Sequence, residues 1–276
     1  MIRKLWNAIK DIGRSRETKK NPEDEAWDYF DRGIEYSSKR LYEKAEDCYK
    51  KAIQIEPQFL LAHINLAIAY RSLGKHQQAI ETYQRALQIK PEYADAYHGI
   101  ALTYANAEQH KESIEFCKKT IQINPSFDHA YALLGASCSE LGLWREAAEA
   151  YERAIHLGLD YALMHLSLGT AYMKFDEHEK AESALKRAIL INPNYSEAYA
   201  RLGWTYGNQE RTEEAERAFV QAIRLNPTNA EAHYGLGVIY FLRGEESLGF
   251  RQYEILIKLD RNLATELDKV KKKHGL

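Results

Sequence analysis

The sequence predicts an all-α solenoid built from antiparallel helix pairs, and three observations predict it. Five of the six prolines fall on a 34-residue spacing, with one interval doubled. A small residue precedes each of these prolines by 24 positions, and every 34-residue unit contains two stretches of apolar residues at helical spacing. The prolines are Pro57, Pro91, Pro125, Pro193 and Pro227, and the small residues on the same lattice are Gly33, Ala67, Ala101, Gly135, Gly169, Gly203 and Gly237. A period this regular indicates a repeat protein.

The unit at residues 60–93 shows why each repeat is expected to be a helical hairpin. Leu61 and Ile64 belong to one apolar stripe, and a turn containing Gly74 separates it from a second stripe that begins at Ala79. Gly or Ala at the helix crossing lets two backbones approach closely. Proline at the end of the unit cannot extend the second helix, and it suits the first turn of the next one.

In this arrangement the units resemble the tetratricopeptide repeat. The shared pattern has an aromatic residue at position 4, Leu at 7, Gly or Ala at 8, Tyr at 11, Ala at 20, an aromatic residue at 24, Ala at 27 and Pro at 32. It recurs in seven successive units, at residues 26–59, 60–93, 94–127, 128–161, 162–195, 196–229 and 230–263. The resemblance implies a right-handed superhelical α-solenoid.

Three parts are expected along the chain. Residues 1–25 form a basic amphipathic helix and a charged linker, residues 26–263 form the seven repeats, and residues 264–276 form a C-terminal capping helix with a basic tail. Terminal repeats of a solenoid need a polar outer face, which the capping helix supplies. Within the repeats, Leu159 replaces the proline of the fourth unit, and we expect this departure to change packing locally.

The N-terminal segment is basic and amphipathic. Residues 1–20 carry seven Lys or Arg against Asp11 and Glu17, a net charge of +5, while the whole chain has −2, so the remainder carries −7. The apolar face contains Ile2, Leu5, Trp6 and Ile9, and the basic face contains Arg3, Lys4 and Lys10. Because so short a helix is marginal alone in water, three outcomes stay open. The segment docks on repeats or a partner, binds an anionic membrane, or remains an untethered tail.

Composition excludes several classes of function. The near-neutral charge argues against a nucleic-acid protein that relies on a basic field. The three cysteines have no paired spacing, so reduced structural thiols are expected. An apolar run long enough to span a membrane is missing, and Asn7, Lys10 and Asp11 interrupt any signal peptide. We therefore expect a cytoplasmic protein, with possible peripheral membrane contact through residues 1–13.

The sequence offers no catalytic, cofactor or metal site. Gly235 and Gly237 begin a glycine pattern, but Tyr240 stands where a phosphate loop needs its third glycine. His63, His165 and His233 hold repeat position 4, which is aromatic in other units, so they are expected in the core. No Ser, Cys or Lys has a recognisable activating partner at motif spacing.

The resemblance also implies a binding surface, because the first helix of each tetratricopeptide repeat lines the concave face. The residues carried over to this face are Trp27, Phe30, Ile34, Leu61, Ile64, Ile68, Arg71, His98, His129, Leu163, Leu166, Met173, Trp204, Tyr234 and Phe241. Solvent-facing helix positions are normally polar, so apolar residues here indicate a binding surface or an internal contact. Trp27, Phe30, Trp204 and Phe241 are expected to be exposed anchors.

These observations lead to a hypothesis of function. The chain is predicted to be a non-enzymatic scaffold or adaptor that binds a peptide or amphipathic helix of a protein partner in an apolar groove. Two alternatives remain: a membrane-surface recruiter that uses the N-terminal helix, and the regulatory subunit of a separate enzyme. No nucleic-acid partner and no cofactor are expected.

Overall fold

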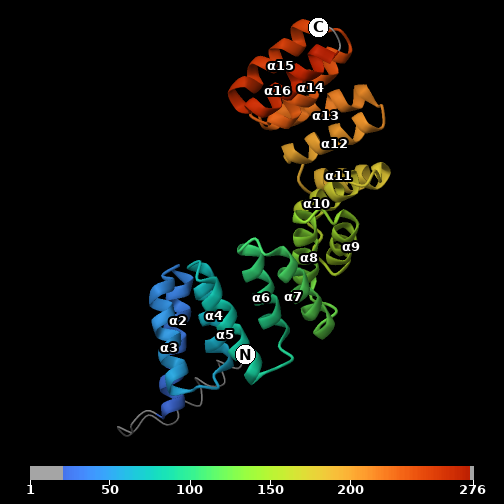
Figure 1. The fold of residues 1–276 in the computed structure, drawn as a ribbon. Helices are drawn as coiled ribbons and strands as arrows, with labels where there is room; N and C mark the ends of the chain where they lie inside the picture. Colours follow the sequence, from blue (N-terminus) through green and yellow to red (C-terminus); the bar gives the residue numbers. More distant parts are fainter. Residues whose placement is uncertain (1–20, 274–276) are drawn as a thin grey trace. The chain divides into compact units, whose positions relative to one another are not determined.

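The computed structural model describes residues 21–273, and these residues form helices joined by short turns (Figure 1). The part of the chain that is described contains helices and no strand. In order, the helices are α2 (Pro22–Ser38), α3 (Tyr42–Ile55), α4 (Leu60–Ser72), α5 (His76–Ile89), α6 (Ala94–Asn106), α7 (His110–Ile123), α8 (Asp128–Glu140), α9 (Trp144–His156), α10 (Ala162–Met173), α11 (His178–Ile191), α12 (Ser196–Asn208), α13 (Thr212–Leu225), α14 (Ala230–Leu242), α15 (Glu246–Leu259) and α16 (Arg261–Lys273). The predicted all-α class is confirmed.

Helices pair as the repeat predicts. Within a repeat, α2 packs on α3, α4 on α5, α8 on α9, α10 on α11, α12 on α13 and α14 on α15, and α6 and α7 hold the same places in the third repeat. The chain divides into two compact units, residues 1–99 and 100–276, with the boundary inside α6. The solenoid of helix pairs is therefore confirmed within each unit, and the handedness of the superhelix stays a prediction.

Each helix pair turns at one residue with a left-handed backbone. The turn residue falls at the same repeat position every time, so the seven turns share one geometry. Only three of these positions carry glycine, the residue that adopts positive φ without steric cost. They are Gly74, Gly142 and Gly244, and the other four are Arg40, Glu108, Asp176 and Glu210.

Proline sets the loop between most consecutive repeats. The residue before it has an extended backbone, as at Glu56, Asn192 and Asn226, because the proline ring disfavours the helical region for its predecessor. The fourth repeat differs. Gly158 has φ of 123°, and Leu159, in place of the proline, is buried. Tyr161 is exposed, whereas the aromatic residue or asparagine at the same position of the other loops is buried or half-buried.

Close approach of the two helices in a pair needs a small residue at the crossing. A Cβ atom added at Gly33 would lie 2.4 Å from the Tyr49 ring, and one added at Gly135 would lie 2.7 Å from the Tyr151 ring. The rings themselves are buried and fill the space beside each glycine. The predicted small-residue lattice therefore marks helix crossings.

Buried residues at the repeat positions bear out two further predictions. His63, His165 and His233 are buried, and their Nε2 atoms lie 2.9 Å from the Pro57 carbonyl oxygen, 2.7 Å from the Asp160 carboxylate and 2.9 Å from the Pro227 carbonyl oxygen, respectively. The three cysteines are free and buried. Burial raises the pKa of the Cys117 thiol to about 12.

The first helix begins four residues before the predicted start of the first repeat. Helix α2 begins at Pro22, so residues 22–25, predicted as linker, belong to the first turn of a helix. Proline suits this turn, and Glu23, Asp24 and Glu25 interact favourably with the helix dipole there. At the other end, α16 begins at Arg261 and buries Ala264 and Leu267. Residues 1–20, which include the predicted amphipathic helix, lie outside the described residues.

Substituting glycine at a helix crossing is expected to disturb one repeat and not its distant neighbours. Gly135→Leu wedges the α8–α9 crossing against the Tyr151 ring, and in a nearest-neighbour stack this divides thermal unfolding into two transitions. Calorimetry measures the number of transitions.

The matched control is Gly207→Ala in α12, where no neighbouring atom lies within 4 Å of an added Cβ. It should stabilise by about 0.5–1 kcal/mol through helix propensity. A single, equally cooperative transition in the Gly135→Leu variant would contradict the solenoid account.

Candidate functional site: the exposed faces of the first helices

In the first unit, four apolar side chains are exposed on two adjacent first helices. Trp27 and Ile34 lie seven residues apart on α2, and Leu61 and Ile68 lie seven apart on α4, so each pair is on one helix face. Their exposed fractions are between 36% and 40%. The Trp27 indole is held in place by the Phe59 ring, whose centroid is 4.6 Å away. We call these four residues the unit 1 apolar face.

Several predicted anchors are buried, and the expectation that they are exposed is wrong. Phe30 is 7% exposed and packs against Tyr49 and Phe59, at centroid distances of 5.8 and 5.0 Å. Phe241 is 2% exposed and fills the space beside Gly249. Ile64 and Leu166 are also buried. The physical reason is that the side chains at these positions point between neighbouring helices, so they contribute to the core and not to a free surface.

The remaining predicted residues are spread between half-buried and exposed positions. Arg71 and His98 in the first unit are half-buried. In the second unit Leu163 is 51% exposed, and His129 is exposed beside Asp128, whose carboxylate lies 2.6 Å from its Nδ1 atom. Met173, Trp204 and Tyr234 are half-buried. The predicted docking residues Ile2, Arg3, Lys4, Leu5, Trp6, Ile9 and Lys10 lie outside the described residues.

Three hollows adjoin one another on the first helices of the second unit. The first, between α10 and α12, has a volume of about 270 Å³ and includes Met173 and Trp204. A second lies toward α8 and includes Leu163, and a third lies toward α14 and α16. Arg201, on α12, lines all three. Reasoning from the sequence missed this residue.

Arg201 is held without strong hydrogen bonds. Its Nη1 atom lies 3.1 Å from a Glu231 carboxylate oxygen, and its Nη2 atom lies 3.8 Å from Glu197. The Nε atom is buried and, among residues 21–273, has no hydrogen-bond partner. Of the five N–H donors of this arginine, the one on Nε is the donor that the described residues leave unpaired.

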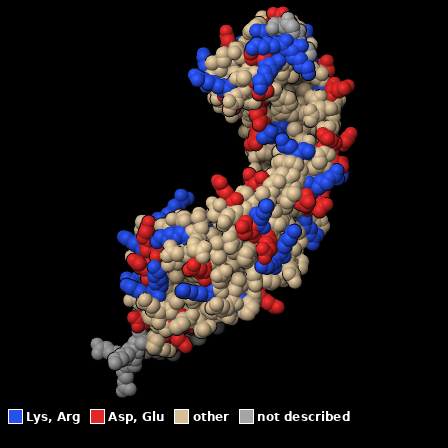
Figure 2. Space-filling model, viewed as in Figure 1, with Lys and Arg blue, Asp and Glu red and all other residues tan. Residues whose placement is uncertain are grey.

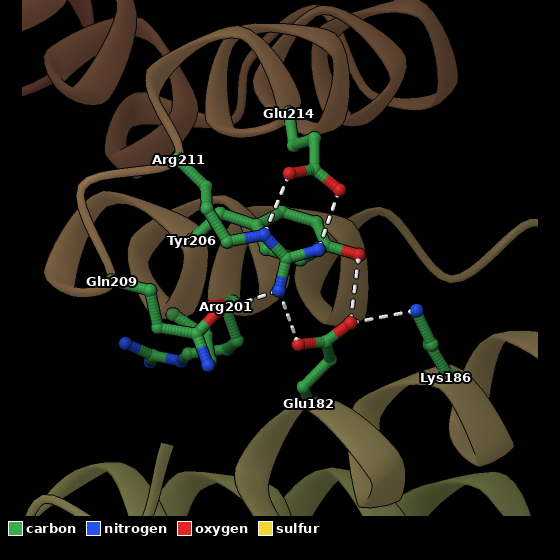
Figure 3. Close-up of polar contacts among 8 residues, drawn as sticks. Glu182, Lys186, Arg201, Tyr206, Gln209, Arg211 and Glu214 are labelled. Atoms are coloured by element: carbon green, nitrogen blue, oxygen red, sulfur yellow. Dashed lines mark hydrogen bonds and ion pairs between the residues drawn. The ribbon is translucent and has the colours of Figure 1, made fainter. Parts of the chain in front are cut away.

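Nearby Arg211 is the opposite case (Figure 3). Its guanidinium donates from Nε and Nη2 to both oxygens of Glu214, and from Nη1 to Glu182 at 2.6 Å and to Gln209 at 2.8 Å. It also lies over the Tyr206 ring, 4.3 Å from the centroid. Glu214 and then Glu182 raise the pKa of Arg211 above its usual value. This arginine joins α11 to the following repeat, so its role is structural.

The same contact recurs 136 residues earlier, which the sequence could have shown. There Glu46 on α3 accepts from Lys50 at 2.6 Å and from Lys75 of the next repeat at 2.7 Å, just as Glu182 pairs with Lys186 and Arg211. Partial burial opposes ionisation of Glu46, but Lys50 and Lys75 outweigh it and keep its pKa below the usual value. A glutamate followed 29 residues later by a cation is the signal of this inter-repeat ion pair.

Charged residues of both signs are mixed over the face shown in Figure 2, and Lys and Arg gather over the C-terminal helices. The last turn of α16 is basic, with Lys271, Lys272 and Lys273. Within residues 21–273, no group of three or more His, Cys, Asp or Glu residues could hold a metal ion. No helix in that range is long and apolar enough to cross a membrane.

Family comparisons agree with this architecture. Models described as tetratricopeptide repeat match residues 26–59, 48–81, 94–127, 139–198 and 184–217, and one described as TPR repeat matches 67–107 and 206–244. The chain belongs to the tetratricopeptide repeat family. Such a fold indicates a protein–protein interaction module. No curated protein matches the chain.

Several solved structures share the fold. YrrB, described as a TPR protein with an unusual peptide-binding site, is 23% identical with a TM-score of 0.62, over 67% of this chain and 95% of YrrB. A MamA structure is 27% identical with a TM-score of 0.56, over 60% of this chain and 97% of MamA. PilF of Pseudomonas aeruginosa is 20% identical with a TM-score of 0.64, over 77% and 97% of the two chains.

Alanine substitutions on α2 and α4 should distinguish a surface residue from a core residue by their effect on stability. Leu61→Ala is expected to lower the free energy of unfolding by about 1 kcal/mol or less, because Leu61 is 40% exposed. Phe30→Ala is expected to lower it by about 3–5 kcal/mol, since it leaves a cavity among buried rings. Urea titration measures both, and equal losses would contradict the assignment of Leu61 to a free surface.

Proposed function

We propose that this tetratricopeptide protein is a non-enzymatic scaffold that binds a peptide or helix of a protein partner on the exposed faces of its first helices. The observation that carries the proposal is the unit 1 apolar face, where Trp27, Ile34, Leu61 and Ile68 are all more than a third exposed on adjacent helices. Isolated apolar residues on a surface are ordinary, whereas an aligned set on neighbouring helices is typical of an interaction site. A scaffold of this kind would act in the cytoplasm.

The apolar face alone supports weak binding. Its four side chains are 36–40% exposed, so covering the part that remains exposed contributes about 0.6–1.2 kcal/mol each. Because association costs about 4 kcal/mol or more, hydrogen bonds or charged contacts with the partner must add to this apolar contribution. A regulatory subunit of a separate enzyme would use the same face. YrrB, whose description names a peptide-binding site, supports the proposal as a protein of the same fold.

A second candidate function rests on the N-terminal sequence. Residues 1–20 carry a net charge of +5 and include Trp6 among apolar residues at helical spacing. Each Lys or Arg near an anionic membrane surface contributes about 1 kcal/mol, and tryptophan suits the interface. The segment would then recruit the repeats to a membrane. The competing roles are docking on repeats of the same chain and docking on those of a second copy.

Peptide selection tests the scaffold proposal. Random dodecapeptides selected on the full chain should include binders whose affinity falls at least about tenfold on Leu61→Ala, Ile68→Ala or Leu163→Ala. Fluorescence anisotropy with labelled peptides measures the affinity. Leu190→Ala and Val220→Ala are matched controls, because these aliphatic residues are exposed on the second helices α11 and α13. Loss of binding in the control variants alone would refute the proposed face.

Tryptophan fluorescence tests the second candidate. A variant that keeps Trp6 and replaces Trp27, Trp144 and Trp204 by Phe reports on the N-terminal segment alone. Membrane binding predicts a blue shift that requires anionic vesicles and is reversed by salt. A blue shift without vesicles at every concentration indicates docking within the chain, and one that appears on concentration indicates self-association. Red emission throughout would exclude all three roles.

A further inference from the structure

We infer that the unit 1 apolar face is the docking site of the chain's own N-terminal segment, residues 1–13, which covers this face when no partner is bound. The segment is then a tethered ligand that a partner peptide has to displace. This inference rests on the proposed scaffold function, because it names a regulation of the same face.

The segment and the face have matching apolar spacing. The four residues of the unit 1 apolar face form two pairs, each seven residues apart, on α2 and α4, which contact each other. In the segment, Ile2, Leu5, Ile9 and Ile12 recur at intervals of three, four and three residues. Seven residues are about 10.5 Å of helix in both cases. Because apolar residues at these intervals form the seam between packed helices, a helix of residues 1–13 can pack along α2 and α4.

Opposite charges favour this occupant. Residues 1–20 carry a net charge of +5. Helix α2 contains six acidic residues and one basic residue, Arg32, a net charge of −5. At physiological ionic strength such charges attract each other over about 8 Å, which is the distance between packed helices. The basic segment and the acidic first helix are therefore complementary.

The charges also lie beside the apolar residues on both partners. On α2, Glu23 lies four residues before Trp27 and Asp31 lies four residues after it, so both are on the Trp27 side of the helix. Both acidic residues are exposed. In the segment, Arg3 and Lys10 are seven residues apart along one border of the apolar stripe. An apolar seam with opposite charges at its border fixes which surfaces pair.

The covalent connection makes a weak face sufficient. Helix α2 begins at Pro22, so the eight residues 14–21 join the segment to it. Eight extended residues span at most about 26–29 Å, and the 17 residues of α2 are about 25 Å long. The segment therefore reaches the whole length of α2. Tethering gives it an effective concentration of about millimolar, so a contact too weak for a free peptide is occupied.

Competition between the segment and a partner peptide gives the test a distinctive sign. The experiment uses selected peptides without charged side chains that Leu61→Ala or Ile68→Ala weakens. The full-length double variant Leu5→Ser/Ile9→Ser should bind them about tenfold more tightly, because its segment has lost half of the apolar stripe and leaves the face open. The matched control is Asn7→Ser, on the opposite side of the segment, which should leave the affinity unchanged.

Charge substitutions on the repeats test the same competition from the other partner. Glu23→Gln with Asp31→Asn should also tighten binding of the uncharged peptides, because it weakens attraction of the basic segment. Glu43→Gln with Asp47→Asn is the matched control, since it removes two exposed carboxylates from α3, the second helix of the same repeat. Equal effects of the two double substitutions would contradict docking beside α2. Melting curves verify that each variant folds.

Carbodiimide cross-linking locates the segment directly. At low protein concentration it should join Lys10 to Glu23 or Asp31 within one chain, and Leu5→Ser/Ile9→Ser should remove these cross-links although the tether is unchanged. Cross-links that form only between chains, or that the double substitution leaves unchanged, overturn the inference. In the tryptophan fluorescence measurement, docking predicts a blue shift without vesicles, and a shift that requires vesicles also overturns it.

Failure of the inference is distinguishable from failure of the scaffold proposal. If Leu5→Ser/Ile9→Ser does not tighten binding while Leu61→Ala or Ile68→Ala still weakens it, the docking inference fails and the scaffold proposal stands. If no selected peptide responds to Leu61→Ala, Ile68→Ala or Leu163→Ala, the scaffold proposal fails, and the cross-links alone decide the docking.

Discussion

The rest of the structure depends on the close approach of the two helices in each repeat. Gly33, Gly135 and Gly203 lie so near a buried ring of the paired helix that an added Cβ would come within 3 Å of it. This approach lets large rings from the second helices fill the core of each pair, and the 34-residue period repeats it along the chain. Each pair then buries its remaining faces against the next, so stability is a sum of neighbouring contacts.

The same packing decides which residues stay free to bind. Side chains such as Phe30 and Leu166 point between successive helices and are buried in the core. Trp27 lies less than one helical turn from Phe30, and Leu61 lies less than one turn from the buried Ile64, yet both Trp27 and Leu61 remain exposed. The ion pairs of Glu46 with Lys75 and of Glu182 with Arg211 join the second helix of one repeat to the turn of the next repeat.

The sequence predicted the fold closely and the site in part, for physical reasons. The proline lattice and the small crossing residues are properties of single repeats, so they are readable from spacing alone. The exposure of a side chain cannot be predicted from spacing, because it depends on how neighbouring repeats pack together. An apolar residue at repeat position 5 or 12 suits either a core or a surface. Arg201 escaped notice because only the structure shows its unpaired Nε atom. The start of α2 at Pro22 was missed since acidic residues suit a linker and a first helical turn alike.

Hydrogen–deuterium exchange with and without a selected peptide tests the central claim, that partners bind on the first helices. The account predicts slower exchange on peptide binding in α2 and α4, or in α10 and α12, with little change in the paired helices α3, α5, α11 and α13. Protection centred on the second helices, with the first helices unchanged, would contradict it.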